Sequence, residues 1–228
     1  MLSPHLDAMV AEFRTRNAPL ISDTRTMLDG ILTDSNLHAR FANTLSMLEH
    51  IGSRKIMVTQ QARDIGQTTL KHIAEEARHA FFFKRRAEEI AKRALRPAEL
   101  VAPAAARMYF QRLETAIVRS GPRFVHARTN YLLTSMVIEF RAVWFYEIYQ
   151  AALTAAGSSM SLKSLLAEER SHLTEMAAGV DAAENVAVER IRGFCAAEQR
   201  LYANLIGEIN RTVLPDAEKL GVRRTGTG

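Results

Sequence analysis

Cysteine is almost absent from this chain of 228 residues, because Cys195 is the only one. A single cysteine excludes an internal disulfide, and it also excludes a four-cysteine iron–sulfur or rubredoxin-like module. A reducing cytoplasm is therefore the expected compartment. The first residues, Met1 to Asp7, lack the basic start and long apolar core of a signal peptide. No apolar run reaches the roughly 18 residues needed to cross a bilayer, so no membrane span is expected.

Proline and glycine are scarce as well, with 6 and 11 residues that stand mostly at segment ends. Runs of β-branched residues, which favour strands, are lacking, whereas the helix formers Ala, Leu, Arg and Glu dominate. The sequence therefore predicts an all-α protein, and its length is sufficient for one sizeable core. The net charge is +5, but the basic residues are scattered. We expect a solvated basic face and no nucleic-acid partner.

Caps and breakers divide the chain into helices. Leu6, Met9, Val10 and Phe13 have helical spacing and predict a short helix that lies on the body. Asp34, Ser35 and Asn36 are candidate N-caps for the next helix. The expected organisation is an N-terminal extension over residues 1–34, a four-helix bundle with further helices over 35–214, and a flexible tail over 215–228.

Within residues 35–214 the pattern predicts six helices. The first begins near residue 35, and the others cover about 67–94, 104–119, 123–156, 160–178 and 182–213. Arg96-Pro97 is expected to end the second helix and Gly179 to end the fifth. The helix over 104–119 is an insertion that makes a long crossover, and the helix over 182–213 is expected to pack on the bundle or on a second subunit.

The pattern Glu-x-x-His occurs twice, at Glu76–His79 and at Glu169–His172. At 3.6 residues per turn the two side chains of such a pair project from one face and can hold one metal ion. Each copy follows a helix with a lone acid on its apolar side, Glu49 and Glu139. The two steps are similar, 27 residues from Glu49 to Glu76 and 30 from Glu139 to Glu169. The chain therefore reads as one helical hairpin used twice.

Two single Glu and two Glu-x-x-His pairs form the ligand set of a di-metal site inside a four-helix bundle. Four carboxylates and two neutral imidazoles nearly balance two divalent ions. The expected ligands are Glu49, Glu76 and His79 for one ion and Glu139, Glu169 and His172 for the other, with Glu76 and Glu169 as bridges. The alternative is a helical bundle with surface acids and a few buried, hydrogen-bonded histidines.

The acids that precede the two motif Glu residues have an expected role as well. A metal-bound imidazole usually donates its second N–H to a carboxylate or carbonyl. Glu75 is therefore expected to orient His172, and Glu168 to orient His79; the alternative is two solvated acids. His72 is an open candidate for an outer group or an extra ligand, and Glu147 competes with Glu139.

These residues resemble the ferritin-like di-iron carboxylate proteins. The second hairpin is most similar to the aldehyde-deformylating oxygenases, in Ile138–Ala142, Tyr146, Ile148-Tyr149 and Glu169–Leu173. Arg78-His79 with Phe83 is similar too, and the resemblance covers about residues 35–178. It implies a bundle whose two irons bind O₂ beside an apolar channel, and Tyr146 matches a tyrosine near the metals. Tyr146 is thus the catalytic candidate, with an ordinary core aromatic as the alternative.

The expected function is a non-haem di-iron oxidase or oxygenase that acts on a small apolar or amphipathic substrate. Its cofactors are two Fe ions, with Mn/Fe as an open choice. Its expected partners are the substrate, O₂ and a separate electron donor such as a ferredoxin or reductase, and a homodimer stays open. A pocket for the substrate has as candidate lining residues Phe81, Phe82, Phe83, Met136, Val143 and Trp144, with plain core packing as the more common role of such side chains. Alternatives are a ferroxidase that handles iron and a non-catalytic helical binding protein.

Overall fold

The computed structural model describes residues 4–59, 65–120, 127–181 and 185–214, which form helices and no strand. The all-α prediction is therefore confirmed. The helices are α1 (Pro4–Asn17), α2 (Ile21–Leu32), α3 (Ser35–Thr59), α4 (Gln67–Ala91), α5 (Pro103–Ser120), α6 (Ala127–Ala155), α7 (Lys163–Asp181) and α8 (Asn185–Val213), with a short 3₁₀ turn at Ala18–Leu20. The expected tail over 215–228 lies outside the described residues.

Local chemistry explains several helix ends. Asp34 Oδ1 accepts hydrogen bonds from the N–H groups of Asn36 and Leu37, at 2.7 and 3.3 Å. Asp34 therefore caps α3, as one of the three candidates predicted. At its C-terminus, α4 ends at Lys92, which adopts a left-handed conformation with φ of 55°. After α6, Gly157 adopts φ of 66°, a conformation that glycine takes without steric strain.

The prediction for the helix over 160–178 is wrong at both ends, because α7 runs from Lys163 to Asp181. Its start is delayed because Gln150 Oε1 accepts a hydrogen bond from the N–H of Leu162 at 2.6 Å, which ties this turn to α6. Its end passes through Gly179, since one glycine weakens a helix by only about 1 kcal/mol relative to alanine.

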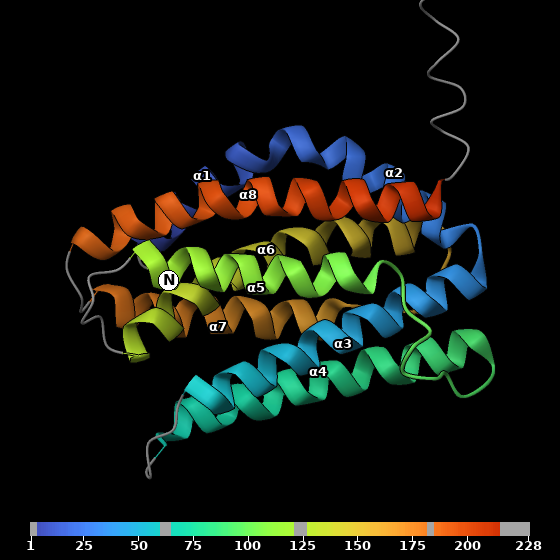
Figure 1. The fold of residues 1–228 in the computed structure, drawn as a ribbon, viewed down its shortest axis with the longest axis horizontal. Coiled ribbons are helices and arrows are strands. Elements are labelled where there is room, and N and C mark those ends of the chain that lie inside the picture. Colours follow the sequence, from blue (N-terminus) through green and yellow to red (C-terminus); the bar gives the residue numbers. More distant parts are fainter. Residues whose placement is uncertain (1–3, 60–64, 121–126, 182–184, 215–228) are drawn as a thin grey trace, which may run out of the picture.

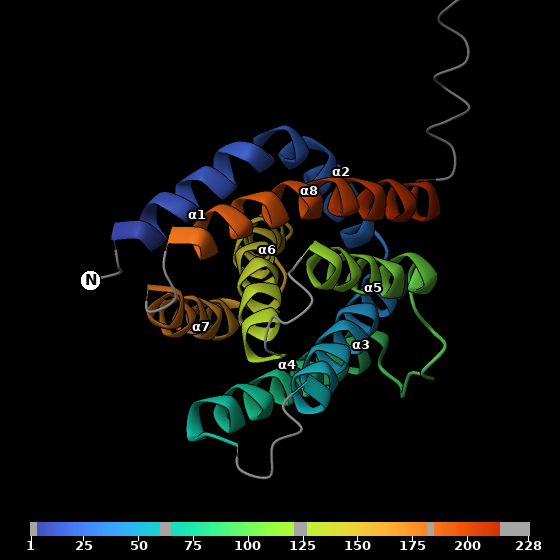
Figure 2. The same ribbon diagram turned by 60° about the vertical axis from the view of Figure 1, so that its left-hand side comes forward.

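Helix α6 occupies the middle of the molecule. Figure 2 shows it surrounded by α3, α4, α5, α7 and α8. Its side chains are apolar on nearly every side and mostly buried, as expected for a helix enclosed by others. In Figure 1, α3 and α4 form an antiparallel hairpin along one side, and this pair makes the most extensive helix contact. The crossover from α4 to α6 contains α5.

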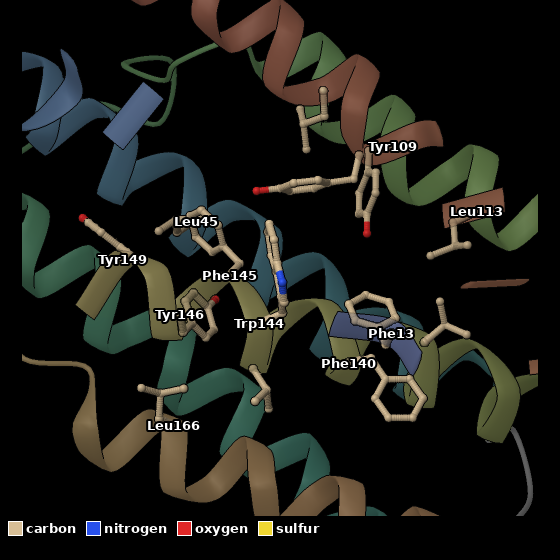
Figure 3. Close-up of a cluster of buried hydrophobic side chains, with 14 of the residues drawn as sticks. Phe13, Leu45, Tyr109, Leu113, Phe140, Trp144, Phe145, Tyr146, Tyr149 and Leu166 are labelled. Carbon is tan, nitrogen blue, oxygen red and sulfur yellow. The ribbon is translucent and has the colours of Figure 1, made fainter. Parts of the chain in front are cut away.

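The remaining helices cover the other side of α6. Figure 1 shows α8 beside α1 and α2, and α8 also contacts α5 and α6. The predicted packing of the long C-terminal helix on the bundle is therefore confirmed. In the aromatic core of Figure 3, the ring of Phe13 on α1 stacks on Phe140 of α6, with centroids 5.5 Å apart. The N-terminal helices thus contribute to the core.

No helix in the described part of the chain is long and apolar enough to cross a lipid bilayer.

The lone cysteine yields a simple prediction. Cys195 is buried in α8, and its burial together with the charge of Glu198 raises the pKa of the thiol to about 12. Because the thiolate is the nucleophile, a disulfide reagent at pH 8 is expected to leave the native chain unlabelled and to titrate one thiol per chain after unfolding in guanidinium. Fast labelling of the native protein would contradict this burial.

Candidate metal centre

Four helices bring the six expected ligands to one place in the interior. Helix α3 supplies Glu49 and α6 supplies Glu139, while α4 and α7 supply one Glu-x-x-His pair each. Each of these side chains lies on the side of its helix that faces the other three. All are buried except Glu49, which is half-buried while its carboxylate reaches the others. The helical hairpin predicted twice from the spacing therefore converges on one polar cluster inside an apolar core.

Within the described residues, these side chains form two overlapping groups whose ligand atoms lie within 4.8 Å of one another. One group is Glu49, Glu76, His79 and Glu169, and the other is His72, Glu76, Glu139 and His172. Glu76 belongs to both groups. The predicted division differs in two respects, because Glu169 groups with Glu49 rather than with Glu139, and His72 joins the group of Glu139.

Glu169 nevertheless faces both motif histidines. Its Oε1 lies 3.2 Å from Nδ1 of His79, and its Oε2 lies 3.0 Å from Nδ1 of His172. The two oxygens of one carboxylate therefore point toward the two groups of ligands. This is the arrangement of a carboxylate that can span two ions about 3.5–4 Å apart.

The acids next to the motif hold the two histidines as predicted. Nε2 of His79 donates to Glu168 at 2.7 Å, and Nε2 of His172 donates to Glu75 at 2.9 Å. A carboxylate only accepts, so these contacts place the N–H on Nε2 and turn Nδ1 toward the cluster. Within the described residues, the buried Nδ1 of His79 makes no hydrogen bond. Both imidazoles thus present an inward nitrogen suited to a metal ion.

His72 is the residue whose position was left open, and the structure places it in the centre. It is 5 % exposed, and its Nε2 lies 3.3 Å from Glu76 Oε1 and 3.2 Å from Glu139 Oε1. The signal in the sequence was its spacing, since His72 stands one turn before Glu76 on the same face. The centre therefore offers three imidazoles and four carboxylates.

Glu147, the other open candidate, lies away from the centre. Arg14 binds both of its carboxylate oxygens, at 2.7 and 2.9 Å, and Arg170 binds one at 2.9 Å. Of the histidines not expected as ligands, His38 is hydrogen-bonded to Tyr149 across α3 and α6 at 2.7 Å, and His50 is exposed. His38 therefore makes a hydrogen bond between two helices, and His126 lies outside the described residues.

The carboxylates of the cluster stabilise positive charge on the groups between them. Burial lowers the pKa of His79 and His172, but the hydrogen bonds and charges of the surrounding carboxylates outweigh it and raise these pKa values to about 10 and about 12. Burial and the charge of Glu76 raise the pKa of Glu49 well above its ordinary value. Divalent cations satisfy such a donor set by replacing the protons, so the residues present fit a metal centre.

Tyr146 stands beside this centre on α6. Its hydroxyl donates a hydrogen bond to Oε1 of Glu49. Burial and the neighbouring charge of Glu49 raise the pKa of Tyr146 well above the ordinary value, so the phenol stays protonated and keeps donating. The tyrosine singled out in the sequence therefore contacts a candidate ligand directly. Its ring also packs in the aromatic core (Figure 3). The ring centroids of Tyr146 and Phe83 lie 5.7 Å apart.

Gly52 allows α3 to approach the shared carboxylate. A Cβ atom at this position would lie 3.1 Å from Oε2 of Glu76, which is tighter than an ordinary contact. A glycine on the apolar stripe of α3 therefore leaves room for Glu76 to sit between the two groups.

An apolar cavity of about 110 Å³ reaches the centre and touches all four ligand carboxylates. Its walls come from α2, α3, α5, α6 and α8, through residues that include Met27, Leu45, Phe110, Phe145, Ile206 and Ile209. The six candidate pocket residues do not line this cavity, and the alternative of plain core packing describes five of them. Phe81 is 65 % exposed, and the others pack elsewhere in or against the core. Helices outside the two motifs form much of the wall, which the motifs alone do not indicate.

Arg141, two residues after Glu139, belongs to a separate buried network. Its Nε and Nη2 donate to the two carboxylate oxygens of Glu198 on α8, at 2.8 and 2.7 Å, and the Tyr109 hydroxyl donates to the same carboxylate at 2.6 Å. The guanidinium also lies over the ring of Tyr202, 3.8 Å from its centroid. Sequence reasoning assigned no role to Arg141 and missed Glu198, because their pairing crosses from one helix to another.

The two outer acids can be tested separately from the ligands. Glu75→Ala or Glu168→Ala removes the acceptor that orients one histidine, and loss of such a partner typically weakens metal binding by about 10- to 100-fold. We expect this loss in competition titrations with a chromophoric chelator. Glu89→Ala, which removes an exposed acid on α4 paired with Arg86, serves as the control. Unchanged affinity in both variants would refute the orienting role.

Comparison with family models, with curated proteins and with solved structures finds no match to this chain. The inference of function therefore rests on the centre itself.

Proposed function

We propose that this protein is an O₂-dependent di-metal oxidase or oxygenase with a ferritin-like bundle, acting on a small apolar or amphipathic organic substrate. The observation that carries the proposal is the pair of overlapping ligand groups that share Glu76 and open into an apolar cavity. Four carboxylates with histidine nitrogens suit two iron ions, with Mn/Fe as the alternative. The apolar cavity favours this function over iron handling, which does not need a site for an organic substrate.

In this proposal, Glu49, Glu76, His79 and Glu169 hold one ion, and His72, Glu76, Glu139 and His172 hold the other. The bound ions supply the chemistry of O₂ activation, and a separate protein such as a ferredoxin supplies electrons. The chain itself keeps the ligands in place. Glu75 and Glu168 fix both motif imidazoles with Nδ1 inward.

The apolar walls define what the site accepts. Side chains of α3, α5, α6 and α8 exclude water from the carboxylates and favour a substrate with an apolar body. Tyr146 donates to Glu49 and so restrains the one ligand that is only half-buried. The wall residues thus orient the substrate, and Tyr146 orients its ligand partner Glu49.

The proposal is tested by loading the metal-free full-length chain anaerobically with Fe(II), measuring iron per chain, and then admitting O₂ with a chemical reductant and a panel of apolar substrates. We expect two irons per chain and O₂ uptake that an accepted substrate increases. The His79→Ala/His172→Ala variant is the control, in which both are lost.

Two results would overturn this function. Absence of stoichiometric iron in the native chain would leave a helical bundle without a metal role. Oxidation of many Fe(II) equivalents per chain, without substrate and with retention of a ferric product, would replace the oxygenase by iron storage.

A further inference from the structure

A second cavity, of about 90 Å³, reaches the centre from another side. It lies between α3, α4, α5 and α6 and touches His72, Glu76 and Glu139, but not Glu49 or Glu169. It therefore approaches one ligand group only. In that group, Nε2 of His72 lies 3.3 Å from Oε1 of Glu76 and 3.2 Å from Oε1 of Glu139. The apolar cavity described above touches Glu49 and Glu169 as well.

The outer part of this second cavity reaches the protein surface. Val118 on α5 lines it and is 53 % exposed. Lys55 on α3 and Glu114 on α5 also line it and form a salt bridge, with side chains 32 % and 38 % exposed. The hydroxyl-bearing Thr134 and Ser135 contribute to the wall nearer α6. A charged pair thus stands at the mouth, and candidate ligands stand at the inner end.

A divalent cation needs such a lining to enter. Moving an ion from water into an apolar medium carries a large desolvation penalty, and the walls of both cavities are mostly apolar, so an entering ion depends on the polar groups placed along its route. The second cavity offers a carboxylate at its mouth, hydroxyl-bearing residues along its wall and two carboxylates with an imidazole at its end. Oxygen ligands of this kind replace water around a hard cation.

We infer that this second cavity is the entry route for divalent metal ions, and that Lys55 and Glu114 set the rate at which ions reach the centre. The inference rests on the proposed di-metal function and adds to it the path and the two residues that control loading. In the native chain Lys55 offsets the negative charge of Glu114. Removing Lys55 makes the mouth more negative, and removing Glu114 makes it more positive.

The test uses the metal-free full-length chain mixed rapidly with Co²⁺, whose visible absorption reports occupancy of the centre. Lys55→Met is expected to load faster and Glu114→Gln slower than the native chain, because charge at a cleft changes association rates by about tenfold or more. The double variant is expected to load near the native rate. High salt should reduce these differences. The final number of ions per chain should stay the same in every variant.

A matched control is the exposed ion pair Arg211–Glu208 on α8, where Arg211→Met and Glu208→Gln are expected to leave the rate unchanged. A purely structural ion pair predicts the same direction of change for both of its single variants. Normal Co²⁺ content with equal rates, or with rates shifted in one direction, would overturn the entry route alone. Absence of stoichiometric Co²⁺ in all variants, the native chain included, would overturn the di-metal function together with the route.

Discussion

Replacement of Glu76 by alanine is expected to remove both metal ions at once. Glu76 is the only residue common to the two ligand groups found among the described residues, so its loss takes a carboxylate from each ion. In contrast, Glu49→Ala and His72→Ala each remove a ligand from one group and are expected to leave one ion tightly bound. Metal content after desalting, measured on all three variants and on Glu89→Ala as control, separates these outcomes.

A second prediction concerns the thermal stability of Glu76→Ala without metal, which is expected not to decrease. The four clustered carboxylates repel one another, as the raised pKa of Glu49 beside Glu76 indicates. Glu76→Ala relieves this repulsion, so its thermal midpoint without metal should not fall as a cavity-forming substitution would predict. Addition of metal should raise the midpoint of the native chain and leave that of Glu76→Ala unchanged. Retention of one ion by Glu76→Ala would show that the carboxylate is not shared.

Arg141→Met is expected to be the most destabilising substitution outside the centre. It leaves Glu198, which is fully buried, without its cation. Removal of one member of a buried ion pair typically lowers the free energy of unfolding by about 3–5 kcal/mol, because an uncompensated charge is left in the interior. Urea unfolding followed by circular dichroism should show this loss in the free energy of unfolding, with Lys84→Met as a control for a half-buried cation.

The double variant Arg141→Met/Glu198→Gln tests the reason for this loss. It removes the charge that Arg141→Met leaves unpaired, and the amide oxygen still accepts from the Tyr109 hydroxyl. We expect it to recover more than half of the stability. Metal content per folded chain should be the same in all of these variants, since Arg141 and Glu198 belong to neither ligand group. A double variant no more stable than Arg141→Met would show that packing of the long arginine stem dominates.

The part of the centre that could be predicted from the sequence depends on helical periodicity. Glu76 with His79, and Glu169 with His172, are three residues apart, so helix geometry alone places each pair on one face. The apolar surroundings of Glu49 and Glu139 then indicate that these acids point inward. The pairing of Glu75 and Glu168 with the opposite histidines followed from the chemistry of imidazole ligands, and the structure confirms it.

The rest depends on contacts between helices that no local pattern encodes. The apolar cavity takes walls from α5 and α8, whose positions are decided by packing. Arg141 and Glu198 are 57 residues apart in the chain, and either sequence neighbourhood alone suggests only a charged residue on an amphipathic helix. The bond between Tyr146 and Glu49 likewise needed the register of α3 against α6. The metal, substrate and electron donor stay predictions.

The crossed hydrogen bonds of the centre have a consequence for how the protein matures. The orienting acid of α4 serves a histidine of α7, and the orienting acid of α7 serves a histidine of α4. Neither hairpin alone therefore contains a complete ligand group, because each group takes ligands from both hairpins. The proposed metal binding therefore requires that both hairpins have folded and packed together.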